Sequence, residues 1–269
     1  MAFQTKDSRG KWRRQMKAFL AGVFALLTLT LAPGQLFGDF WNFPPLPAPH
    51  EYGNILINRT SEKNGVKPVF FSHWSHRLKY ACRVCHLELD FAFSANTTEI
   101  TEEENRNGLY CGACHNGIVA FGHTKENCNK CHSGTLSSGQ ERFEKITAKF
   151  PYAPFGNKLD WVAAVADGTI KPVYSLHGDQ PESSIKFRER LELAAEWNYV
   201  PPAFFPHGPH IKLLDCANCH PDIFNIKKKT TKHFKMQYIL EGRFCGVCHL
   251  RVAFPLNDCN RCHPGIDSD

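Results

Sequence analysis

Residues 70–86 read FFSHWSHRLKYACRVCH, which places three histidines and two cysteines within seventeen residues. The stretch ends in a C-x-x-C-H motif, residues 82–86, and carries an H-x-x-H pair, His73 and His76, upstream of it. A C-x-x-C pair alone is compatible with a disulfide, a zinc site, a redox motif or covalent haem attachment. To decide between these possibilities, we ask whether the other C-x-x-C pairs of the chain are also followed by a histidine.

The C-x-x-C-H motif recurs five more times and accounts for all twelve cysteines of the chain. The six copies are Cys82-x-x-Cys85-His86, Cys111-x-x-Cys114-His115, Cys128-x-x-Cys131-His132, Cys216-x-x-Cys219-His220, Cys245-x-x-Cys248-His249 and Cys259-x-x-Cys262-His263. Two thiols at this spacing can each bond one vinyl group of the same haem, and the next histidine can ligate the iron. Zinc and thioredoxin-type motifs require no histidine there. The pattern therefore predicts six covalently bound c-type haems, with the motif histidines as proximal ligands.

Covalent attachment also predicts the fold class. Because thioether bonds hold each haem, the polypeptide needs no large apolar pocket for it, and six haems can share about 230 residues. Gly, Pro and Asn are dense around the motifs. We expect a mainly α and irregular fold, in which short helices and loops wrap around the haems.

The motifs fall into two groups of three, and the sequence around them repeats. FFSHWSH (70–76) matches FFPHGPH (204–210), GLYCGACH (108–115) matches GRFCGVCH (242–249), and CNKCHSG (128–134) matches CNRCHPG (259–265). This predicts two triheme units, which we call the first repeat (66–134) and the second repeat (200–269). A Pro-rich leader (39–65) precedes them, and a haem-free linker (135–199) with short helices at 159–167 and 185–197 separates them.

The amino-terminal segment, residues 1–38, is predicted to be an export signal. It carries net charge +5 of the +6 of the whole chain, and an apolar run at 18–32 follows its basic residues. The rest of the chain is therefore nearly neutral, which argues against nucleic-acid binding. An uncleaved membrane anchor is the alternative. Export predicts a periplasmic protein, with an extracellular or outer-membrane-associated location as the alternatives.

Each repeat, with F-x-H-x-x-H followed by three C-x-x-C-H motifs, resembles the triheme cytochrome c7 domain of the cytochrome c3 superfamily. The resemblance implies that the first histidine of H-x-x-H ligates the first haem and the second histidine the next one. Carried over, these pairs are His73 with His86, His76 with His115, His207 with His220, and His210 with His249.

The third haem of each repeat departs from the family pattern, which expects a histidine shortly before the second C-x-x-C-H motif. The second repeat offers His233, with Met236 as a competing ligand. The first repeat has no histidine at that place, and His123 is its remaining candidate. We assign His123 and His233, and leave His50 and His177 as surface or propionate-contacting residues.

The predicted function is electron transfer without substrate chemistry, because an iron with two strong ligands can only pass electrons. The resemblance implies respiratory electron transfer in the bacterial envelope, with other multihaem cytochromes, a quinol-oxidising membrane complex or an outer-membrane conduit as partners, and extracellular acceptors as one destination. Two alternatives stay open. One is a nitrite or hydroxylamine reductase, which needs an open iron, and the other is a haem-wire filament subunit.

Overall fold

The computed structural model describes residues 43, 45–178, 190–225 and 235–266. The chain divides into Met1–Pro44 and Pro45–Asp269, and every element described below belongs to the second part. The predicted export signal lies outside the described residues. Within the described ranges, no helix is both long and apolar enough to cross a bilayer.

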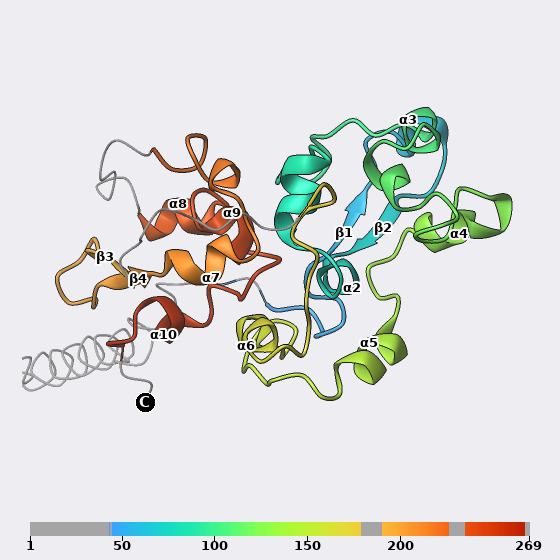
Figure 1. Cartoon of the computed structure of the whole chain (residues 1–269). Helices are drawn as coiled ribbons and strands as arrows, with labels where there is room; N and C mark the ends of the chain where they lie inside the picture. Colours follow the sequence, from blue (N-terminus) through green and yellow to red (C-terminus); the bar gives the residue numbers. More distant parts are fainter. Residues whose placement is uncertain (1–42, 44, 179–189, 226–234, 267–269) are drawn as a thin grey trace, which may run out of the picture. The chain divides into compact units, whose positions relative to one another are not determined.

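Each H-x-x-H pair lies on a five-residue helix that directly follows a strand (Figure 1). In the first repeat, strand β2 (Val69–Ser72) leads into helix α2 (His73–Arg77), and β2 pairs antiparallel with β1 (Asn54–Ile57). In the second repeat, β4 (Ala203–Phe205) leads toward α7 (His207–Ile211) and pairs with β3 (Leu191–Leu193). The sequence repeat is therefore also a structural repeat.

The other elements are short, as predicted. They are the 3₁₀-helices η1 (Glu62–Asn64), η3 (Tyr110–Ala113), η4 (Lys125–Asn127) and η5 (Cys216–Asn218), the π-helix η2 (Val84–Glu88), and the α-helices α3 (Glu102–Arg106), α4 (Cys128–Cys131), α5 (Gln140–Thr147), α6 (Trp161–Ala166), α8 (Met236–Leu240), α9 (Gly246–His249) and α10 (Cys259–Cys262). The longest described helix, α5, has eight residues. The predicted class of short helices and irregular chain is confirmed.

The segment predicted as a linker supplies much of the protein core. Trp74 of α2 packs edge-on against Phe143 of α5, with ring centroids 5.1 Å apart. Trp161 and Ala164 of α6 belong to the same buried cluster. Burying a large side chain of this kind stabilises the fold by roughly 1.5–3 kcal/mol. Residues 135–178 therefore anchor the helix that carries the first H-x-x-H pair.

Helix α6 lies where the sequence predicts one. Asp160 caps its start by accepting hydrogen bonds from the amides of Val162 and Ala163, at 3.1 and 3.0 Å. Gly168, at φ +78°, follows its last turn. The helix predicted over 185–197 is wrong in its described part, residues 190–197. These contain strand β3, because pairing with β4 outweighs the helical charge pattern there.

The leader and the first repeat contact the second repeat through several hydrogen bonds. The Tyr52 hydroxyl donates to the Ala253 carbonyl at 2.6 Å, and the Asn218 amide donates to the His86 carbonyl at 3.2 Å. The Arg83 backbone amide donates to Leu213 at 3.0 Å. These contacts place the first motif of the first repeat against the second repeat.

Candidate haem sites

All six C-x-x-C-H motifs are built on short helical turns. Motif residues lie on η2, η3, α4, η5, α9 and α10. On such a turn, residues three apart face the same side, which is what attachment of both thiols to one haem requires. All twelve cysteines lie in the described residues, and none forms a disulfide. Burial raises the pKa of Cys85 and Cys248 to about 12, so both thiols are neutral at ordinary pH.

Every motif histidine directs its Nδ1 at a backbone carbonyl. A carbonyl oxygen can only accept, so Nδ1 carries the proton and Nε2 is left free to ligate iron. The pairs, with Nδ1–oxygen distances, are His86 to Phe91 at 2.8 Å, His115 to Phe121 at 3.1 Å, His132 to Lys67 at 2.8 Å, His220 to Phe224 at 2.6 Å, His249 to Phe254 at 3.0 Å and His263 to Pro201 at 2.8 Å. All six imidazoles are thus fixed in the tautomer that suits a metal.

Three of the four H-x-x-H histidines are oriented in the same way. His73 donates from Nδ1 to the Gly53 carbonyl at 2.6 Å. His76 and His210 donate to the carbonyls four residues earlier, those of Ser72 and Pro206, both at 2.8 Å. The equivalent bonds of His76 and His210 show that the strand–helix junction positions the second histidine of each pair.

A phenylalanine separates the two histidines of each H-x-x-H pair. The Phe71 ring lies 4.8 Å from the His73 ring and 4.4 Å from the His76 ring, centroid to centroid. Phe205 stands 4.8 Å from His207 and 4.5 Å from His210. The repeated FF dipeptide is visible in the sequence, but its contact with both imidazoles is not. We interpret this ring as a spacer that holds the two imidazoles apart, so that they point in different directions.

The structure brings the imidazole rings of three of the four predicted ligand pairs close together. Ring centroids are 6.5 Å apart for His73 and His86, 6.2 Å for His76 and His115, and 6.1 Å for His210 and His249. A metal-bound imidazole nitrogen lies about 2 Å from its metal and the ring centroid roughly 1 Å beyond, so imidazoles on opposite sides of one metal have centroids about 6 Å apart. The residues present therefore fit an iron between each pair. In the fourth pair, burial is the main cause that lowers the pKa of His207, and the charge of His220 lowers it further.

Burial favours the neutral form of five of these imidazoles, and metal ligation requires that form. It lowers the pKa of both His73 and His249 to about 4. It also lowers the pKa of His76, His86 and His210. Neutral nitrogen lone pairs are therefore available at neutral pH.

The turn before the second motif of each repeat is strained in the same way. Gly108 and Gly242 have φ of +82° and +85°, and Tyr110 and Phe244 have φ of +46° and +52°. Non-glycine residues rarely adopt such angles, and both aromatic residues directly precede a haem-attachment cysteine. The matching φ angles show that both repeats form this turn with the same backbone conformation.

The remaining predicted ligands are placed as follows. His123 is partly buried, its carbonyl accepts a hydrogen bond from Arg106 at 3.1 Å, and burial followed by the charge of His115 lowers its pKa. No ring contact joins it to His132 within the described residues. His233 lies outside the described residues, whereas Met236 is the first residue of α8.

The two spare histidines differ in their surroundings. His50 lies with Nε2 3.7 Å from Glu51, and its carbonyl accepts from the Trp74 indole at 3.0 Å. His177 is exposed to solvent. Neither faces a motif histidine among the ring contacts of the described residues.

Comparison with known proteins agrees with this repeat. The family described as "Cytochrome c7 and related cytochrome c" matches residues 69–133 and 203–264. Among solved structures, the C-terminal hexaheme fragment of GSU1996 is 26% identical, over 82% of this chain and 98% of that one, with a TM-score of 0.26. The dodecaheme cytochrome c GSU1996 is 23% identical, over 80% and 75%, with a TM-score of 0.27. Its N-terminal hexaheme fragment is 21% identical, over 80% and 99%, with a TM-score of 0.25.

A search of curated proteins found no match. The family match falls on the two segments that hold the C-x-x-C-H motifs and the H-x-x-H pairs. The chain is therefore a multihaem c-type cytochrome with two cytochrome c7-type domains, and its six C-x-x-C-H motifs bind six c-type haems.

Proposed function

We propose that this cytochrome carries electrons through mostly bis-histidine haems in the bacterial cell envelope, between redox partner proteins and without substrate chemistry. The observation that supports this most directly is the close approach of three histidine pairs, 6.1–6.5 Å between ring centroids. Cytochrome c7 proteins are typically electron carriers rather than enzymes. Bound haem supplies reversible one-electron chemistry at iron, and two strong axial ligands leave no position for a substrate.

The polypeptide has three tasks in this proposal. Its cysteine pairs would anchor each haem, its imidazoles would ligate the irons, and its short turns would keep the six sites close together. The proposed axial pairs are His73 with His86, His76 with His115, His123 with His132, His207 with His220, His210 with His249 and His233 with His263. Met236 is the alternative to His233.

His123 is proposed by elimination. Residues 66–134 contain six histidines. Three belong to the motifs, and His73 and His76 face His86 and His115. His123 remains, and burial lowers its pKa, which favours the neutral form that can ligate iron.

Location and partners follow from the same chemistry. A c-type cytochrome is exported from the cytoplasm, and we propose the periplasm as its compartment. Other multihaem cytochromes, a quinol-oxidising membrane complex or an outer-membrane conduit would then donate or accept electrons. A near-neutral body is compatible with transient docking of this kind.

Low-temperature electron paramagnetic resonance (EPR) of the oxidised protein, with near-infrared charge-transfer bands, tests the proposal. We expect low-spin signals from all six irons, dominated by His/His ligation. A large high-spin signal that changes on adding nitrite or cyanide would contradict a pure electron carrier.

One observation favours a second function at a single site. His132 has no facing histidine ring among the described residues, in contrast to His86 and His115. If its iron has an open position, that haem could bind and reduce a small molecule such as nitrite. Ligand binding to the reduced protein distinguishes the two functions.

A further inference from the structure

Arg77 is placed between haem-ligand residues of the two repeats. It ends α2, directly after His76. Its Nη1 donates a hydrogen bond to the Val252 carbonyl at 3.1 Å, three residues beyond His249. The arginine of one repeat therefore reaches the haem-binding loop of the other.

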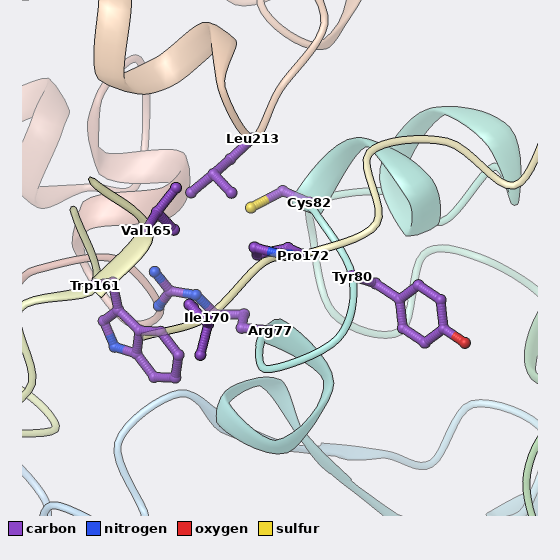
Figure 2. A pocket seen from close by; sticks show the side chains of 8 residues that line it. All are labelled: Arg77, Tyr80, Cys82, Trp161, Val165, Ile170, Pro172 and Leu213. Carbon is purple, nitrogen blue, oxygen red and sulfur yellow. The ribbon is translucent and has the colours of Figure 1, made fainter. Parts of the chain in front are cut away.

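The surroundings of the Arg77 side chain are mostly apolar. Its guanidinium carbon lies 4.3 Å from the centroid of the Trp161 ring. It lines a cavity of about 10 Å³ together with Cys82, Val165 and Leu213, among others. Figure 2 shows the guanidinium directed toward Trp161 and Val165 and away from Tyr80. A cavity of this size holds at most one water molecule, so little solvent screens the charge.

No carboxylate of the described residues lies within ion-pair distance of Arg77. Its electrostatic neighbours are Cys82, Tyr52 and Cys248, and burial lowers its pKa. Arginine nevertheless stays charged in proteins. A positive charge without a counter-ion is costly in an apolar environment. The carbonyl of Val252 and the face of Trp161 stabilise it only in part.

The field of this charge reaches donor groups of two haem sites. Arg77 lines the same cavity as Cys82, and its hydrogen bond to the Val252 carbonyl places it three residues from His249. His73 belongs to the first haem site of the first repeat, and His249 to the second haem site of the second repeat.

We propose that Arg77 is a charge-tuning residue that raises the reduction potentials of these two haems, at the contact between the repeats. Reduction adds one negative charge to a haem site, and a fixed cation in a weakly screened environment favours that form. Arg77 would also raise the potentials if a haem propionate lay beside its guanidinium, because the ion pair carries less negative charge than the propionate alone. The inference rests on the proposed electron-transfer function. It specifies two haems that Arg77 makes easier to reduce.

Redox titration of the full haem-loaded chain tests this proposal, with Arg77→Gln compared against Arg77→Lys. Both side chains can donate to Val252, but only lysine keeps the charge. Arg77→Gln should lower the midpoint potentials of two of the six haems, and Arg77→Lys should restore most of the shift. Arg59→Gln is the matched control, because Arg59 is ion-paired to Glu99 at the surface, and it should leave all six potentials unchanged.

A second variant covers the case in which Arg77→Gln does not fold. Val165→Glu keeps the arginine and places a carboxylate on the same cavity, so the two potentials should fall here as well. Unchanged potentials in Arg77→Gln or in Val165→Glu, with full haem content, would overturn the proposal. Failure of the electron-transfer function itself would show instead as high-spin iron, which the potentials do not measure.

Discussion

The imidazole rings of His73 and His86 face each other 6.5 Å apart and only 8° from parallel. The rings of His76 and His115 are tilted by 54°, and those of His210 and His249 by 60°. Parallel imidazoles donate π-electron density along one common direction and split two iron d orbitals. Strongly tilted imidazoles leave these orbitals nearly equal in energy.

The ring angles predict distinct EPR signals. In the oxidised protein, the haem of His73 and His86 should give a rhombic low-spin spectrum. The two tilted pairs should give highly anisotropic signals with a larger maximum g value. His73→Ala should remove the rhombic signal and create one high-spin haem, whereas His177→Ala, at an exposed histidine, should change neither. Survival of the rhombic signal in His73→Ala would refute this ligand assignment.

Gly112 and Gly246 leave no room for a side chain. A Cβ atom at Gly112 would lie 1.8 Å from the Asn105 carbonyl oxygen, and one at Gly246 would lie 1.9 Å from that of Ile239. Each carbonyl belongs to the short helix before the second motif, so the backbone itself must move. We expect Gly112→Ala and Gly246→Ala each to lower the free energy of unfolding by at least about 3 kcal/mol.

Urea unfolding of the haem-loaded variants measures this loss. Gly208→Ala is the control, because a Cβ there meets nothing within 4 Å. If either glycine variant unfolds at the same urea concentration as Gly208→Ala, the close approach is not structurally important.

The haem sites could be predicted from sequence because their chemistry is local. A C-x-x-C-H motif fixes three groups on one turn, the repeat of H-x-x-H indicated further ligands, and the resemblance to the cytochrome c7 domain implied how the histidines pair. The ring angles could not be predicted, since they depend on distant carbonyls such as Gly53, twenty residues before His73. Arg77 was missed for the same reason, because only the tertiary fold brings it to Val252.

Regular structure outside the motifs was predicted less well. Helix α6 has a capping aspartate and a terminating glycine, and both signals are local. Helix α5 was missed because its charged sequence buries only Phe143 and Thr147. Strand β3 was mistaken for helix because its identity depends on pairing with β4, ten or more residues later.

The hydroxyl of Tyr52 forms a hydrogen bond between the leader (39–65) and the second repeat. It donates to the Ala253 carbonyl at 2.6 Å, and the residue is 2% exposed. Tyr52→Phe removes the donor and leaves a partly buried acceptor unpaired, which should cost about 1 kcal/mol. Tyr152→Phe, at a residue 73% exposed, is the control and should have no effect. Equal urea midpoints for the two variants would show that this hydrogen bond adds nothing to stability.

Carbon monoxide counts the irons that lack a second protein ligand, because it binds reduced haem only where an axial position is open. With His123 as the sixth ligand of the His132 haem, the reduced wild-type chain should bind no carbon monoxide. His123→Ala should then bind one equivalent and show one new high-spin haem when oxidised. His50→Ala is the matched control, since His50 also lies outside the motifs. One equivalent bound by the wild type, unchanged in His123→Ala, would mean that His123 is not a ligand. The third haem of the first repeat would then be the open site that the reductase function requires.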